Sequence, residues 1–171
     1  VLEQTPAVSD DADRSAGEHG RQLGGMYLTF MLNHEEYGVE ILKIREIIGI
    51  MDITKVPQTS RFMRGVINLR GKVIPVIDLR TKFGLEQTEY DDQTCIIVVD
   101  VGALMGIIVD TVQEVHDIAT ADIEPPPQLG SSVDTSFILG MGKVNNDVKI
   151  LLDIDKVLTT DELVQLPEAA R

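Results

Sequence analysis

The sequence predicts a mainly β protein made of two small antiparallel barrels and a few short helices. After Met26, most apolar residues stand in short runs that alternate with polar residues or are rich in Val and Ile, as strands are. The chain also repeats itself: the segment from Tyr37 matches that from Met105, and the segment from Val73 matches that from Val148. Two halves of one plan, with about ten strands, indicate two barrels that each close their own sheet edges.

The first part of the chain is predicted to be a tail, a hairpin and a kinked strand. Residues 1–24 hold few large apolar side chains and many acidic ones, which predicts a disordered acidic tail. MYLTFML and HEEYGVEI predict a hairpin with its turn at 33–35. ILKIREIIGI, from Ile41, fits a helix nearly as well as a strand. Its match to the β-branched segment from Met105 favours a strand, a short kink and a second strand.

EIIGIMDITKVP, from Glu46 to Pro57, carries more Ile and Met than a small barrel can turn inward. Some of these side chains could face outward, where exposed apolar patches mark protein contacts. Alternatively, all of them could fill the space between the two barrels. Both interpretations stay open.

The middle of the chain is predicted to hold a helical turn and a second hairpin. Thr59 or Ser60 gives TSRFMRG a capping signal, which predicts one helical turn. VINL and KVIPVIDL predict a hairpin around Arg70 and Gly71, where Gly71 is free to take a positive φ. Pro75 has no N–H, so we expect it at an edge or facing away from the ladder.

The second half is predicted to follow the same plan. TCIIVVDV and LMGIIVDTVQEV indicate two strands joined at Gly102 and Ala103, before a loop that contains EPPPQLGSS. FILGMGKV and VKILLDI indicate a hairpin with its turn at 145–147. IDKVL and TDELVQL are predicted to be short helices.

Charge and composition disfavour several classes of function. The formal charge of -13 repels nucleic acid and anionic lipid over about 8 Å at physiological salt. With 4% aromatic residues, an oligonucleotide-binding barrel would lack its stacking surface. The single cysteine, Cys95, has no internal partner, no signal sequence is recognised, and no apolar run nears the roughly 20 residues of a membrane span. We therefore expect a cytoplasmic protein.

Patterns for metal or cofactor binding are scarce. His19, His34 and His116 lack the short spacings of zinc ligands, so no metal is expected, and no cofactor either. Cys95 lies in an apolar strand, which favours a structural thiol over a nucleophile.

Three aspartates end strongly apolar strands: Asp78, Asp110 and Asp153. Because Asp78 and Asp153 occupy the same place in the repeat, capping of the following segment is favoured over catalysis. A small enzyme that uses Asp78, Asp110 and His116 is kept as an alternative.

Four motifs stand in order along the chain: EEYGVEILKIREI, GVINLRGKVIPVIDLRTKFG, GIIVDTVQEV followed by IEPPP, and ILLDIDKVL. Together they resemble the CheW family, the coupling proteins of bacterial chemotaxis, from about Met26 to Leu166. The resemblance implies two five-stranded SH3-like barrels. It also implies a non-catalytic adaptor between chemoreceptor signalling tips and the histidine kinase CheA. The coupling protein of a related chemosensory pathway, such as one for twitching motility, is the alternative.

The resemblance also implies a domain layout and a location. Residues 25–166 should form one CheW-like domain, with a C-terminal tail at 167–171. Its two intertwined subdomains should span about 36–90 and 91–150, completed by the terminal segments. The protein should be cytoplasmic and recruited to membrane-associated receptor arrays.

Two sets of contact residues follow from the resemblance. In the family a helical hairpin of the receptor docks in the groove between the barrels, and the matching positions here are Ile44, Glu46, Gly65, Asn68, Leu69, Arg70, Gly71 and Val115. The expected kinase contacts are Ile48, Ile50, Ile53, Glu124, Gln128 and Leu129. Some members carry a basic residue where this chain has Glu124, so charge pairing there would be absent or reversed.

Arg70 stands beside a predicted turn of an acidic protein, and two interpretations are open. Its guanidinium could project toward carboxylates or carbonyls on a docked helix. Alternatively, it could be a solvent-facing turn residue that pairs locally with Glu46.

Overall fold

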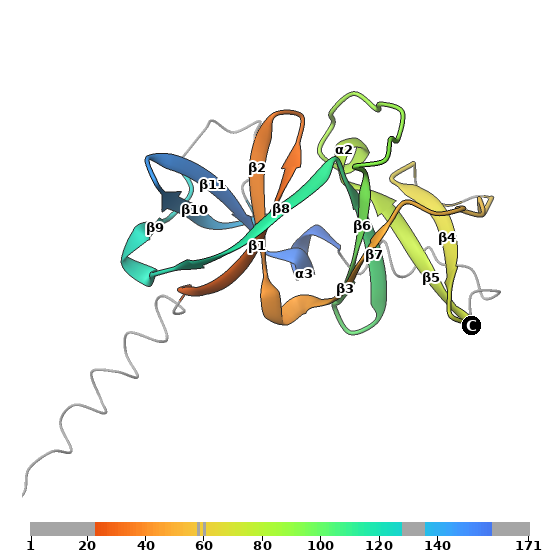
Figure 1. Ribbon diagram of the computed structural model, residues 1–171, viewed down its shortest axis with the longest axis horizontal. Coiled ribbons are helices and arrows are strands. Elements are labelled where there is room, and N and C mark those ends of the chain that lie inside the picture. The colour runs from red at the N-terminus through yellow and green to blue at the C-terminus, as the bar shows by residue number, and fades with distance from the viewer. Residues whose placement is uncertain (1–22, 58, 60, 128–135, 159–171) are drawn as a thin grey trace, which may run out of the picture.

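The computed structural model describes residues 23–57, 59, 61–127 and 136–158 (Figure 1). Most of the predicted N-terminal tail, the predicted helix TDELVQL and the predicted C-terminal tail lie outside these residues. Other residues named above that lie outside them are His19, Ser60, Gln128 and Leu129.

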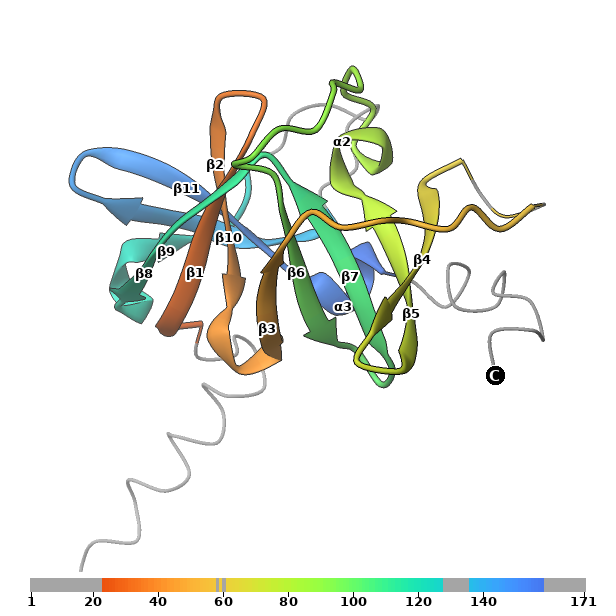
Figure 2. The same ribbon diagram turned by 45° about the vertical axis from the view of Figure 1, so that its right-hand side comes forward.

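Over the described ranges, the strands form two sheets, which lie side by side (Figures 1 and 2). The first has the spatial order β8 (Thr111–Ile118), β1 (Gly25–Leu32), β2 (Glu35–Glu40), β11 (Asp147–Leu152), β10 (Ile138–Val144) and β9 (Ile123–Glu124). The second has the order β3 (Ile44–Gly49), β6 (Cys95–Asp100), β7 (Leu104–Val109), β5 (Lys72–Asp78) and β4 (Met63–Leu69). Short helices connect them: η1 (Ile41–Lys43), α2 (Leu79–Lys82), η2 (Thr120–Asp122) and α3 (Ile154–Val157).

The sequence repeat is also a repeat of structure. Each sheet contains one parallel pair, β11 with β2 in the first and β5 with β7 in the second. Leu151 faces Gly38 in one pair, and Val76 faces Gly106 in the other. Each sheet takes strands from both sides of residue 90, and the predicted subdomain limits near that residue stay a prediction.

The two outer strands of each sheet are close together in the chain. In the first sheet, β8 leads through η2 into β9. In the second, β3 leads to Thr54, which exchanges two backbone hydrogen bonds of 2.8 Å with Val66 of β4. Each sheet therefore curls so that its two outer strands approach each other. The mainly β prediction is confirmed, and the arrangement is consistent with two SH3-like subdomains.

The predicted hairpins are confirmed, and their turns share one backbone geometry. Asn33 and His34 join β1 to β2, and both have positive φ, 50° and 72°. Arg70 (53°) and Gly71 (87°) join β4 to β5 in the same way. Two successive positive φ values match the right-handed twist of paired strands. The positive φ of Gly71 was expected, whereas that of Arg70 was not.

Pro75 lies where the sheet needs no N–H donor, as expected. It faces Val66, whose N–H and C=O are both bonded to Thr54, so this pair needs no hydrogen bond from β5. The pairing of β5 with β7 starts one residue later, at Val76.

The prediction of a helical turn at TSRFMRG is wrong. Arg61 and Phe62 form a simple turn, and β4 begins at Met63. Thr59 does not cap a helix, because its Oγ1 donates to the carbonyl of Val56 at 3.0 Å. Pairing with β5 outweighs the capping signal, because the predicted hairpin extends back beyond VINL as far as Met63.

The capping prediction holds for one of the two equivalent aspartates. Asp78 precedes α2, and its Oδ1 accepts from the Arg80 N–H at 2.9 Å. Asp153 precedes α3 without a side-chain cap, so the prediction is wrong there. Its carboxylate lies within electrostatic reach of Lys43 instead.

In the described residues, the core has one large cluster between the sheets and two smaller ones, of which one belongs to the second sheet and the other to the first. Side chains of both sheets, α2 and α3 make the large cluster, including Phe30 and Ile107. The apolar residues of EIIGIMDITKVP do not fill the space between the two sheets, so that interpretation is wrong, and one of them faces outward as the other interpretation expected. Four of them pack partly buried on the small cluster of the second sheet, whereas Ile47 is 42% exposed. The four are Ile48, Ile50, Met51 and Ile53.

Candidate functional site

An exposed ion pair joins the β4–β5 hairpin to β3. Arg70 donates through Nη1 to Glu46 Oε2 at 3.0 Å, and through Nη2 to Oε1 of the same carboxylate. This bond and the charge of Glu46 raise the pKa of the guanidinium further above its usual range. The Arg70 side chain is 68% exposed and that of Glu46 29%. The structure therefore shows the local pairing of the second interpretation, and contact of the exposed guanidinium with a docked helix stays a prediction.

The hairpin that carries Arg70 is held by its own backbone and amide groups. Asn68 Oδ1 accepts from the Gly71 N–H at 2.8 Å, which closes the turn. Gly65 has a φ of +145°, and a Cβ there would lie 2.1 Å from the carbonyl oxygen of Thr54. Gly65 is therefore required for the bridge between Thr54 and β4, and its place among the expected receptor contacts has a structural reason.

Two exposed apolar residues mark the outer strands β3 and β8. Ile47 on β3 is 42% exposed and Val115 on β8 is 41% exposed, and the repeat makes the two positions equivalent. Ile44, also expected at the receptor surface, packs partly buried against the core between the sheets. Figure 1 shows β8 crossing from the end of β7 to lie beside β1. The expected receptor residues thus lie on the second sheet, apart from Val115.

Sequence reasoning missed Ile47 and Leu42. Leu42 lies in η1 and is 92% exposed. The repeat held a signal for Ile47, because Val115 had been singled out at the equivalent position. For Leu42 the signal was weak, since an apolar residue in a predicted kink is as easily buried as exposed.

The expected kinase contacts fall on both sheets. Ile48, Ile50 and Ile53 follow one another along β3 and the segment after it, where they pack partly buried on the core of the second sheet. Glu124 lies in β9 of the first sheet. Its carboxylate bonds to Lys143 Nζ at 2.7 Å, and this bond lowers the pKa of Glu124. Lys143 thus provides a positive charge beside Glu124, the residue where some family members are expected to carry a basic side chain.

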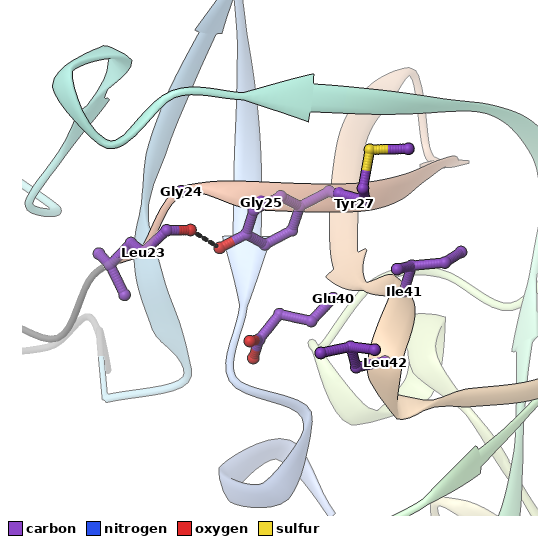
Figure 3. Close-up of a pocket in the computed structure, with 8 residues that line it drawn as sticks. Leu23, Gly24, Gly25, Tyr27, Glu40, Ile41 and Leu42 are labelled. Carbon is purple, nitrogen blue, oxygen red and sulfur yellow. Dashed lines mark hydrogen bonds between the residues drawn. The ribbon is translucent and has the colours of Figure 1, made fainter.

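A small, mainly apolar pocket lies beside η1 (Figure 3). It has a volume of about 220 Å³, with Tyr27 held by a hydrogen bond to the carbonyl of Leu23 at 2.5 Å. Its lining residues are Leu23, Gly24, Gly25, Met26, Tyr27, Glu40, Ile41 and Leu42.

The two aspartates of the alternative enzyme are engaged in structural contacts. Asp78 is buried and accepts from Tyr90 Oη at 2.8 Å as well as from Arg80 N. Asp110 accepts from Arg80 Nε at 2.7 Å, from Arg80 Nη2 at 2.6 Å and from the Asn33 N–H at 2.9 Å. Burial opposes ionisation of Asp110, but these bonds outweigh it and lower its pKa. Both carboxylates are therefore occupied by structural partners.

His116 lies apart from Asp110. It is six residues along the chain from Asp110 on an extended strand, roughly 20 Å at about 3.3 Å per residue. Its Nε2 is 3.8 Å from Glu114 Oε1. The enzyme alternative is therefore not favoured.

The part of the chain that the structure describes holds no group of three or more His, Cys, Asp and Glu side chains that could bind a metal ion. Cys95 is a free cysteine, and its Sγ donates to the carbonyl of Gln93 at 3.3 Å. In the same residues, no helix is long and apolar enough to span a membrane.

Comparison with known proteins decides the family. Residues 26–162 match the family described as CheW-like domain. The chain belongs to the CheW-like domain family. The chemotaxis protein CheW of Klebsiella aerogenes is 37% identical over 153 residues, which cover 89% of this chain and 92% of that protein. CheW of Helicobacter pylori is 35% identical, covering 79% and 82% of the two chains.

A solved relative confirms the fold. The scaffolding protein TtCheW of Thermoanaerobacter tengcongensis superposes with a TM-score of 0.74 at 36% sequence identity. The match covers 82% of this chain and 96% of that one. The resemblance to the CheW family that the motifs indicated is thus confirmed.

Proposed function

We propose that this chain is a non-catalytic adaptor of chemotaxis, which couples chemoreceptor signalling tips to the histidine kinase CheA. Membership of the CheW-like family over 26–162 supports the proposal, as do relatives named chemotaxis proteins and one named a scaffolding protein. The domain that performs this role spans about residues 25–166. It acts in the cytoplasm, at arrays of membrane-bound receptors.

The receptor surface that we propose centres on Arg70 and Glu46. The observation that carries it is a forked, solvent-facing ion pair with exposed apolar Ile47 next along β3. A docked helix can offer a carboxylate or a carbonyl to the free side of the guanidinium, which has five N–H donors. Its apolar face can cover Ile47 and Val115.

The kinase surface that we propose has two parts on opposite sheets. Ile48, Ile50 and Ile53 form the apolar part on the second sheet, and Glu124 on the first sheet belongs to the other. Gln128 and Leu129 are proposed for the same part as Glu124, and they lie outside the described residues. Because Lys143 already neutralises Glu124, a cation from the kinase is not needed there. Two separate kinase surfaces would allow this chain to alternate with the kinase in a ring, because each copy would then contact two kinase subunits.

The test is a pair of titrations. The purified chain is titrated with the regulatory domain of CheA and, separately, with a receptor signalling-tip fragment. We expect saturable binding to both, roughly micromolar or tighter, and the bound kinase domain should not displace the receptor fragment. A folded chain that binds neither fragment would contradict the proposal.

A further inference from the structure

Arg64 has no carboxylate partner among the described residues, unlike three other arginines of the chain. In the described residues, Arg45, Arg70 and Arg80 each bind a carboxylate of this chain, whereas no carboxylate lies within ion-pair distance of Arg64. The chain has a net charge of -13, so acidic partners are abundant. An arginine that is half-buried and has none of them is available to bind a carboxylate from elsewhere.

The backbone gives Arg64 a special position. Met63 faces Ile77 and Gly65 faces Val76, so Arg64 is the extra residue of a β-bulge in β4. Bulges re-aim side chains and are common next to functional sites. The repeat has the same bulge in β10, where the extra residue is Leu139, which packs on a small apolar cluster. The second sheet thus places a guanidinium where the first has an ordinary apolar contact.

Neutral groups hold the guanidinium in place. Gln87, with its amide oriented to satisfy both groups, accepts through Oε1 from Arg64 Nη1 at 2.8 Å and from Nη2 at 3.0 Å. The guanidinium lies 5.7 Å from the centre of the Tyr90 ring, and Tyr90 Oη is fixed by Asp78. Burial first, and then the bond to Asp78, raise the pKa of Tyr90, so this phenol stays a donor. The Tyr90 hydroxyl is a further neutral hydrogen-bond partner of Arg64, so this preorganised guanidinium has no carboxylate partner among the described residues.

Two shallow pockets meet at Arg64 and Tyr90. One, of about 230 Å³, is also lined by Met51, Asp52, Ile53 and Lys55, and the other, of about 400 Å³, by Gln87, Thr88 and Glu89. Lys55 adds a second cation, and Met51 and Ile53 add apolar surface. Asp52 and Glu89 would repel a run of acidic residues, so the site fits a single carboxylate with apolar groups around it.

We infer that Arg64, flanked by Lys55 and Tyr90, recognises one Asp or Glu side chain on the protein surface that covers Ile53. The partner rests on the proposed function, because Ile53 belongs to the surface that we assign to the regulatory domain of CheA. Arg64 is then a determinant of specificity at this contact, because an apolar surface alone would leave the desolvated guanidinium unpaired.

The test compares three variants that each lower the net charge by one. Arg64→Gln should weaken binding of the CheA regulatory domain about tenfold or more, the effect expected for a charged hydrogen bond. Gln87→Glu keeps Arg64 but gives it a carboxylate of its own chain, and should weaken binding similarly. Arg61→Gln is the control, since Arg61 lies over the Phe62 ring at 5.4 Å and lines neither pocket. Arg61→Gln should change the affinity for the regulatory domain less than about twofold, because it changes only the net charge, and salt screens that effect.

Thermal unfolding of each variant checks the fold, and Gln87→Glu keeps the test decisive if Arg64→Gln unfolds. Equal affinities of Arg64→Gln, Gln87→Glu and Arg61→Gln would overturn the inference and leave the proposed function intact. If the unmodified chain does not bind the regulatory domain, the proposed function fails and the inference fails with it.

Discussion

At the scale of single residues, the Arg70–Glu46 pair stabilises the fold little. Arg70 is 68% exposed, and exposed ion pairs contribute about 0–1 kcal/mol because water screens them and ordering two long side chains costs entropy. The pair can therefore rearrange toward a partner without unfolding the hairpin, which Asn68 and the turn geometry hold.

This predicts that binding and stability respond separately. Arg70→Ala or Glu46→Lys should weaken binding to the receptor fragment about tenfold, as loss of a charged hydrogen bond does. The free energy of unfolding should change by less than about 1 kcal/mol. The measurements are titration and chemical denaturation. Lys143→Ala is the matched control, because it breaks an exposed ion pair on the other sheet. Undiminished receptor affinity in both variants would remove Arg70 and Glu46 from the receptor surface.

Asp110 makes stability depend on pH. Burial raises its pKa, but bonds from Arg80 and Asn33 lower it more, so the folded value lies below the unfolded one. The stability that Asp110 contributes is therefore fully present above the unfolded pKa of about 3.9 and is lost as pH falls through the lower folded value. Denaturation at pH values from about 6 down to 2 should show a steeper loss below about pH 4 in the unmodified chain than in Asp110→Asn. Parallel curves for the two proteins would contradict this assignment.

At the scale of elements, the two halves use one plan with different side chains. In the second sheet, Ile74 is buried and Leu104 packs on the same cluster. The repeat places Lys149 and Glu36 at these positions in the first sheet, and they form an ion pair of 2.6 Å. Only 6% of the Lys149 side chain is exposed. A charge pair here replaces an apolar contact, and such exchanges are often neutral or unfavourable for stability.

The expected consequence is strong coupling between the two residues. Glu36→Leu leaves the Lys149 charge buried and unpaired and should cost about 3 kcal/mol of unfolding free energy. Adding Lys149→Met should recover most of this loss, to within about 1 kcal/mol of the unmodified chain. Denaturant titration of both single variants and the double variant gives the coupling. Additive effects would mean that the ion pair does not form in solution.

The elements that could be predicted from the sequence are those with local signals or a repeat. The turns at Asn33 and Arg70 were predictable because polar and glycine residues separate runs of strand character. The kink at η1 was predictable only through the repeat. A helical turn was wrongly predicted before β4, and the bulge at Arg64 was not predicted, because both depend on how far β4 pairs with β5 and in which register. The site is predictable to a similar degree: Arg70 and Glu46 lie together as one interpretation expected, whereas the role of Lys143 beside Glu124 depends on β9 pairing with β10.

At the scale of the whole molecule, two curled sheets present separate surfaces and share one core. The cluster between the sheets takes side chains from both of them and from two short helices, so the proposed receptor and kinase surfaces are held in fixed relation. Each contact can be weak, because in an array linked contacts reinforce one another through effective concentration. The charge of -13 disfavours nucleic acid as a competitor.

The central claim is that the chain joins receptor to kinase. The most direct measurement sediments membranes that contain chemoreceptors with purified CheA, in the presence and absence of this chain. We predict that CheA sediments with the membranes only when the chain is present, and that Arg70→Ala lowers the sedimented fraction. The claim would be contradicted if CheA stays in the supernatant although the chain itself is bound, or sediments equally without it.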